Sequence, residues 1–163
     1  MIGVSRCLLG ECCTYKGTHH LDDILKDLAR HGQVVGVCPE VLGGLPIPRN
    51  PAEIMSFHPL LIQTNQGKDV TDEYIVGARK ALKIFLDNDV HVAVLKWRSP
   101  SCGNDGIYDG TFSHNLVDGQ GVFASMCEEQ GIRIFNENQM KEFLKYIGKE
   151  DDYGTYFKDS TSI

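Results

Sequence analysis

Short apolar segments alternate with helical segments along residues 2–147 of this 163-residue chain. The apolar segments are too short for helices and lack a polar residue at every second position, which is typical of strands buried on both faces. The expected strands are residues 2–5, 33–37, 60–63, 90–95 and 132–135. Four helices are expected. They cover residues 21–31, residues from a cap at 69–72 to about 88, residues 119–130 and residues 137–147. This alternation predicts an α/β fold, with a Rossmann-like parallel sheet of about four to five strands and helices on both faces.

The second expected helix also indicates which of its faces is buried. Its apolar residues Ile75, Ala78, Leu82 and Phe85 are three or four positions apart and therefore share one side of a helix. We expect this side to pack against the sheet.

Length and charge limit the organisation of the chain and its partners. We expect one domain over residues 1–150, followed by a polar, acidic C-terminal tail over residues 151–163. Sixteen basic against 22 acidic residues give a net charge of −6 without a basic run, which argues against a nucleic-acid polymer as partner. A free nucleobase or another small molecule remains open. With no segment long enough to cross a bilayer and no secretory signal, we expect no membrane association and a cytoplasmic location.

Three of the six cysteines follow predicted strands. They are Cys7, Cys38 and Cys102, the last in a Ser-Pro-Ser-Cys-Gly loop. Ligands of parallel sheets bind outside the carboxyl ends of the strands, so these thiols are expected at one crevice. In a reducing compartment, six cysteines are not expected to form a disulfide framework.

The residues alone leave the role of these thiols open between metal binding and burial. A Cys-x5-Arg phosphate loop is excluded, because the sixth positions after the three cysteines hold Cys13, Gly44 and Tyr108. Thiolates with a histidine or water would suit zinc, with His19, His20 and His114 in candidate loops, and thiolates alone would suit an iron–sulfur cluster. The simplest alternative is that some are ordinary buried thiols.

The other three cysteines carry less weight. Adjacent side chains rarely bind one ion together, so Cys12 and Cys13 are interpreted as accessory residues or as one spare ligand. Cys127 lies in an apolar helical segment and is predicted to be a core thiol.

Several motifs, in this order and spacing, resemble the DUF523 family, which contains the 2-thiouracil desulfidases. They are Val4–Gly10, Tyr15–Gly17, Cys38–Arg49, Asp69–Thr71, Leu95–Lys96, Ser99–Gly103 and Ile107–Phe112. The resemblance implies a catalytic domain in which three cysteines hold a [4Fe-4S] cluster with one iron left open. It also implies a non-redox, hydrolytic conversion of C=S to C=O on small thiolated nucleobases such as 2-thiouracil. Aerobic preparation can remove such a cluster.

When the family's motifs are matched to this chain residue by residue, the resemblance implies that Cys7, Cys38 and Cys102 are the ligands of the cofactor and its metal. The implied catalytic groups are Glu40, as general base or acid, and Ser99 or Ser101, with the choice between the serines left open. The chain departs from the family pattern at Arg6 and in having Cys12 and Cys13, which leaves the natural substrate undetermined.

An alternative from another class is a non-catalytic metal- or nucleotide-binding module that uses the same cysteines structurally. A fourth thiolate or imidazole beside the three would close the site and favour this alternative. A zinc deaminase is not indicated, because its His-x-Glu and Pro-Cys-x-x-Cys motifs are absent. Arg49 is predicted to form a surface ion pair, and Tyr108 and Asp109 are either pocket or turn residues.

Overall fold

A four-stranded parallel sheet forms the centre of the computed structural model, which describes residues 1–159. Its strand order is β2-β1-β5-β8, and every neighbouring pair is parallel. The strands are β1 (Ile2–Ser5), β2 (Val34–Val37), β5 (Val92–Leu95) and β8 (Arg133–Asn136). The predicted α/β class with a parallel sheet is therefore confirmed.

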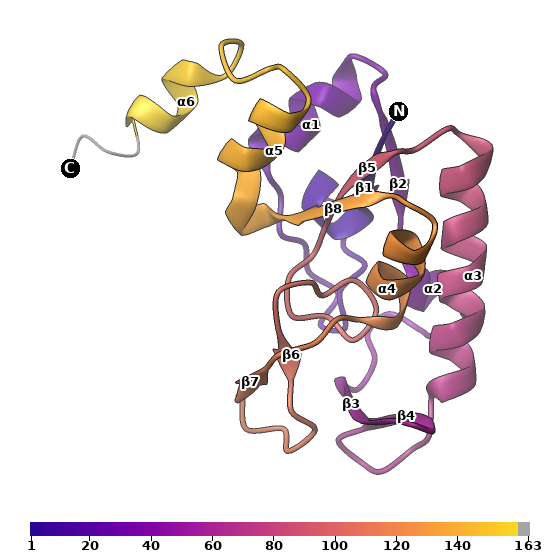
Figure 1. Ribbon diagram of the computed structural model, residues 1–163. Helices are drawn as coiled ribbons and strands as arrows, with labels where there is room; N and C mark the ends of the chain where they lie inside the picture. The colour runs from indigo at the N-terminus through magenta and orange to yellow at the C-terminus, as the bar shows by residue number, and fades with distance from the viewer. Residues whose placement is uncertain (160–163) are drawn as a thin grey trace.

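Helices cover both faces of the sheet (Figure 1). One apolar cluster joins the sheet to α1 (Asp23–Arg30) and α5 (Met140–Tyr146), and the other joins it to α3 (Thr71–Asp87) and α4 (Val122–Glu129). Side chains of β5 alternate between the two clusters, because successive residues of a strand point to opposite faces. Three shorter helical segments complete this part of the chain: η1 (Arg6–Leu9), α2 (Pro39–Leu42) and η2 (Glu137–Gln139).

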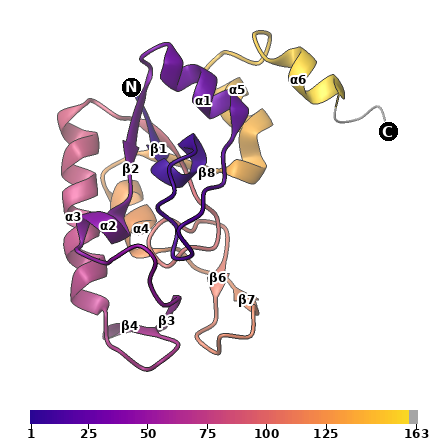
Figure 2. The same ribbon diagram turned by 180° about the vertical axis from the view of Figure 1, so that it is seen from behind.

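Two antiparallel hairpins lie beyond the carboxyl ends of the central strands (Figures 1 and 2). They are β3 (Ala52–Phe57) with β4 (Leu60–Thr64), and β6 (Ile107–Tyr108) with β7 (Leu116–Val117). The predicted strand at residues 60–63 is present as β4, but it pairs with β3 and is not part of the parallel sheet. A short turn joins β3 to β4, whereas a parallel neighbour requires a crossover of a dozen or more residues.

Two glycines allow α2 and α3 to pack in direct backbone contact. A Cβ atom on Gly77 would lie 1.8 Å from the Pro39 carbonyl oxygen, and one on Gly43 would lie 2.0 Å from the Glu73 carbonyl oxygen. Neither position has space for a larger residue. This close approach brings the first turn of α2, which carries Glu40, against the side of α3.

The last described segment forms α6 (Gly154–Asp159). Just before it, the Tyr153 hydroxyl donates a hydrogen bond of 2.7 Å to Asp27 Oδ2 on α1. The segment expected to be a polar, acidic tail is thus attached to α1 at this point, and residues 160–163 of that tail lie outside the described residues. Within residues 1–159, no helix has the length and apolar character needed to cross a membrane.

Candidate functional site

The three strand-end cysteines meet at one cavity. Cys7 lies in η1 after β1, Cys38 is the N-cap of α2 directly after β2, and Cys102 lies in the loop after β5. Because β2, β1 and β5 are neighbours in the sheet, their carboxyl ends place the three residues around a cavity of about 430 Å³. The predicted convergence of these thiols is therefore present in the fold.

A fourth cysteine, Cys13, also lines this cavity. Its side chain is buried in the same apolar cluster as Cys7 and Cys38, whereas the adjacent Cys12 is exposed. The Cys13 carbonyl oxygen accepts a hydrogen bond of 2.9 Å from Arg49 Nη2 and a contact of 3.9 Å from Cys38 Sγ. The two adjacent cysteines are thus in different environments, and only Cys13 belongs to the cavity.

The thiols of Cys38 and Cys102 are held in their neutral form when no metal is bound. Burial raises the pKa of Cys102 to about 12, although hydrogen bonds with Ser5 and Ser101 oppose the shift. A hydrogen bond with Cys13, together with burial, raises the pKa of Cys38. Metal binding would therefore have to displace protons from these thiols.

The donor chemistry of the cavity fits an iron–sulfur cluster. All six cysteines are free thiols, and thiolates are the ligands that such clusters require. Within residues 1–159, no group of three or more His, Cys, Asp or Glu side chains is arranged to hold a metal ion. In a [4Fe-4S] cluster each thiolate binds a different iron, so the ligands are more widely spaced than those of a single ion.

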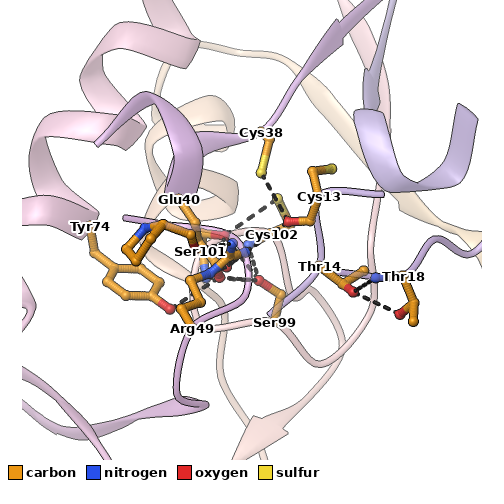
Figure 3. Close-up of polar contacts among 11 residues, drawn as sticks. Cys13, Thr14, Thr18, Cys38, Glu40, Arg49, Tyr74, Ser99, Ser101 and Cys102 are labelled. Carbon is orange, nitrogen blue, oxygen red and sulfur yellow. Dashed lines mark hydrogen bonds and ion pairs between the residues drawn. The ribbon is translucent and has the colours of Figure 1, made fainter. Parts of the chain in front are cut away.

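Glu40 lies in the first turn of α2, at the edge of the same cavity (Figure 3). Its Oε1 accepts a hydrogen bond of 3.1 Å from the Tyr74 hydroxyl on α3. Its Oε2 accepts a hydrogen bond of 3.0 Å from Arg49 Nε, and Arg49 Nη2 also contacts this oxygen. The carboxylate charge is thus balanced by a largely buried guanidinium, so the predicted surface ion pair of Arg49 is in fact buried.

The hydrogen bonds around Ser99 and Ser101 distinguish the two serines. Ser99 Oγ accepts hydrogen bonds of 3.1 Å from the backbone N–H groups of Ser101 and Cys102, which occupies both of its lone pairs. Its own proton must then be donated, either to Ser101 Oγ at 2.9 Å or to Glu40 Oε1 at 3.4 Å. Ser101 Oγ lies 3.4 Å from Glu40 Oε1 and 3.6 Å from Cys102 Sγ. Ser99 therefore shapes the loop, while Ser101 connects the acid to the cysteine.

The remaining predicted pocket residues divide into two groups. Tyr108, His20 and His114 line the cavity. Asp109 does not, because its Oδ1 accepts hydrogen bonds from the backbone N–H and the hydroxyl of Thr111 and so closes a turn. Of the two residues predicted to lie either in the pocket or in a turn, Tyr108 is therefore a pocket residue and Asp109 is a turn residue.

Tyr74 was not predicted as a site residue. It is 3% exposed and lies one turn before Ala78 on α3, where the sequence pattern suggested only a helix packed on the sheet. The signal that could have identified it is the spacing of Tyr74, Ala78, Ala81 and Phe85, which is as regular as that of the predicted face.

Comparison with known proteins agrees with this geometry. A model of the 2-thiouracil desulfurase family matches residues 2–139. The chain is 39% identical over 151 residues to the uncharacterized protein YbbK of Bacillus subtilis (strain 168). The aligned region covers 88% of this chain and 100% of YbbK. Among solved structures, a [4Fe-4S]-dependent thiouracil desulfidase, TudS, superposes with a TM-score of 0.84 at 38% identity over 90% of this chain and 97% of its own. The chain therefore belongs to the 2-thiouracil desulfurase family.

Proposed function

We propose that this protein hydrolyses the C=S bond of small thiolated nucleobases such as 2-thiouracil to C=O, without net electron transfer. The observation that carries the proposal is that Glu40 and Ser101 lie beside Cys102 in the cavity that Cys7 and Cys38 also line. Membership in the 2-thiouracil desulfurase family supports the same substrate class. The overall reaction consumes one water and releases one hydrogen sulfide for each carbonyl formed.

Cys7, Cys38 and Cys102 would hold a [4Fe-4S] cluster. When bound by three thiolates, such a cluster supplies an open iron, a Lewis acid that tolerates soft ligands such as thiocarbonyl sulfur. The buried hydroxyl of Ser101 already hydrogen-bonds the Cys102 thiol and would stabilise the corresponding thiolate in the same way.

Glu40 is proposed to move the proton. As a general base it would accept a proton from the attacking water, and as a general acid it would return that proton to the departing sulfur. Ser101 provides the route, because its hydroxyl lies within hydrogen-bond distance of Glu40 Oε1 and next to Cys102 Sγ. Ser99 would act indirectly, by donating its proton toward Ser101 and fixing the loop.

The cavity suits a single planar ring. Its volume of about 430 Å³ falls in the range of small-molecule sites. The aromatic side chains of Tyr108, Phe112 and His114 line it and offer surfaces on which a base can stack. We assign this chemistry to a single catalytic domain, residues 1–150, followed by an acidic tail at residues 151–163. We place the protein in the cytoplasm because its cysteines are free thiols.

A second candidate function is favoured by the position of Cys13. Its thiol contacts those of Cys7 and Cys38, so a fourth thiolate is available to close the site. A cluster with four protein ligands would have no open iron and would serve a structural or binding role rather than hydrolysis. The presence of Glu40 and Ser101 in the same cavity favours the catalytic alternative, because a closed site needs no proton route.

One preparation separates these functions. The protein should be purified without oxygen, its visible spectrum recorded, and its iron and acid-labile sulfide measured. The holoprotein is then mixed with 2-thiouracil and the loss of thione absorbance followed. We expect a coloured protein with four irons that consumes the thione, as the assigned cluster requires. A colourless, zinc-loaded protein would contradict the cluster, and a coloured but inactive protein would favour the closed site.

A further inference from the structure

Two side chains in the wall of the cavity, those of Tyr74 and Arg49, converge on Glu40. We propose that Tyr74 and Arg49 are positioning residues that hold the Glu40 carboxylate with Oε1 facing Ser101. The inference rests on the proposed function, because it assigns a task to residues that act only through Glu40. Nothing in the sequence motifs assigns this task to either residue.

The packing of α2 on α3 places the Tyr74 hydroxyl within hydrogen-bond distance of the Glu40 carboxylate. Tyr74 is 3% exposed, and its hydroxyl donates to Glu40 Oε1 at 3.1 Å. A carboxylate oxygen can only accept, so the direction of this hydrogen bond is fixed. The close backbone contacts at Gly43 and Gly77 bring the two helices near enough for this hydrogen bond to form.

Arg49 holds the other oxygen of the same carboxylate. Its Nε and Nη2 both contact Glu40 Oε2, and the two side chains are 6% and 13% exposed. The same Nη2 donates to the Cys13 carbonyl at 2.9 Å, and Nη1 donates to the Pro46 carbonyl at 3.2 Å. The guanidinium therefore has fixed partners on several sides, and it ties Glu40 to the loop that carries Cys13.

The lengths of the hydrogen bonds show which partners orient the carboxylate. Ser99 and Ser101 lie 3.4 Å from Oε1, a distance at which a hydroxyl contributes little orientation. The bond from Tyr74 is shorter, and the pairing with Arg49 is charge-assisted and forked. Tyr74 and Arg49 thus set the orientation of Glu40, and Ser101 is left free to exchange a proton with it.

The first test replaces Tyr74 by phenylalanine, which removes the hydroxyl and keeps the ring. Tyr153→Phe is the matched control, because it removes another tyrosine hydroxyl bonded to a carboxylate, that of Asp27, far from the cavity. We expect Tyr74→Phe to lower kcat for 2-thiouracil about ten-fold, with KM within about two-fold of wild type, because one hydrogen bond to a charged group is lost. Iron content and Tm are expected to match those of Tyr153→Phe. A rise in KM alone, or equal effects in both variants, would overturn the inference.

The second test replaces Arg49 by lysine, which keeps the charge but loses the forked geometry. Arg133→Lys, at an arginine that lies over the Phe135 ring, is the control. We expect kcat to fall about ten-fold or more in Arg49→Lys and to stay unchanged in the control. Wild-type kcat in Arg49→Lys would remove Arg49 from the positioning role.

Crystal structures of the wild type, Tyr74→Phe and Arg49→Lys provide a readout independent of turnover. We expect the Glu40 carboxylate to rotate away from Ser101 in both variants. If the wild type does not consume thiouracil but Glu40 rotates in this way, the proposed function fails while the positioning role stands. If the wild type is active and Glu40 keeps its orientation in both variants, the positioning role fails alone.

Discussion

Cys102 and Cys127 show that burial alone does not distinguish a functional thiol from a structural one. Both side chains are buried in the same apolar cluster, at 4% and 0% exposure, and burial is the main cause that raises the pKa of each. Cys102 lies in a loop at the carboxyl edge of the sheet, and its thiol accepts a hydrogen bond of 3.6 Å from the Ser101 hydroxyl. Cys127 lies inside α4, and no hydrogen bond to its thiol contributes to its pKa shift. The difference lies in polar neighbours and in position at the sheet edge.

The local backbone explains why the two thiols differ. Cys127 continues the apolar face of α4 with Phe123 and Ala124, as its helical spacing predicted. Next to Cys102, a Cβ atom on Gly103 would lie 2.6 Å from the Ser99 carbonyl oxygen, so the loop folds tightly on itself. That fold directs the Ser99 hydroxyl toward backbone N–H groups and leaves Ser101 facing Glu40 and Cys102.

The largest expected effect separates these two thiols directly. Cys102→Ser should lose iron and reduce thiouracil turnover to background, because it removes a proposed ligand. Cys127→Ala should keep both, with a loss of unfolding free energy of about 1–2 kcal/mol from the small cavity it creates. Iron assays, turnover and chemical denaturation measure these outcomes. A Cys102→Ser protein that still holds its full iron content would show that Cys102 is a core thiol like Cys127.

The same comparison extends to the two carboxylates of the cavity. Glu53 is also buried, but its Oε1 accepts from the backbone N–H groups of Gly110 and Phe112, so it holds a loop in place. Glu40 is bonded instead to side chains, with the Tyr74 and Ser101 hydroxyls at Oε1 and Arg49 at Oε2. Glu40→Gln should lower kcat by about 10²- to 10⁴-fold, the usual contribution of general acid–base catalysis. Glu53→Gln keeps the accepting oxygen and should change kcat by less than about ten-fold. Similar kcat values for the two variants would exclude Glu40 from proton transfer.

The sequence predicted the parts of the site that depend on sheet topology. Cys7, Cys38 and Cys102 could be grouped because the carboxyl ends of parallel strands meet at one edge, whatever the packing around them. The strand β3 was not predicted, because a bulge between Ile54 and Ser56 breaks its alternation and the polar Glu53 is buried in it. Hydrophobic pattern carries no information about either feature.

Residues that depend on packing between helices could not be predicted. The buried face of α3 contains Tyr74, Ala78, Ala81 and Phe85, whereas the expected face included Ile75 and Leu82. The helix is rotated because Gly77 must face α2, a contact between segments that are distant in sequence. Cys12 and Cys13 posed a similar problem, since local sequence does not say which of two adjacent side chains points into a cavity.

A smaller effect tests whether Cys13 is a cluster ligand like Cys102 or a cavity residue that binds no iron. Cys13→Ser is expected to keep its cluster and to change turnover by less than about three-fold, because three ligands suffice for an open site. Cys12→Ser is the matched control, since Cys12 is adjacent and exposed. Loss of iron in Cys13→Ser, but not in Cys12→Ser, would make Cys13 a ligand and support the closed site.

The smallest expected effect concerns the pH dependence of stability and belongs to Cys127. Its pKa in the folded chain is raised above the ordinary value of 9.0, chiefly by burial. Below that value the thiol is protonated in both states; above it the unfolded chain loses the proton first, so unfolding becomes easier as pH rises. The contribution amounts to at most about 1.4 kcal/mol for each pH unit above 9. The unfolding free energy of the metal-free protein should therefore fall less steeply between pH 9 and 10 in Cys127→Ala than in the wild type. Parallel curves from urea denaturation at each pH would show that this thiol ionises as easily in the fold as in the unfolded chain.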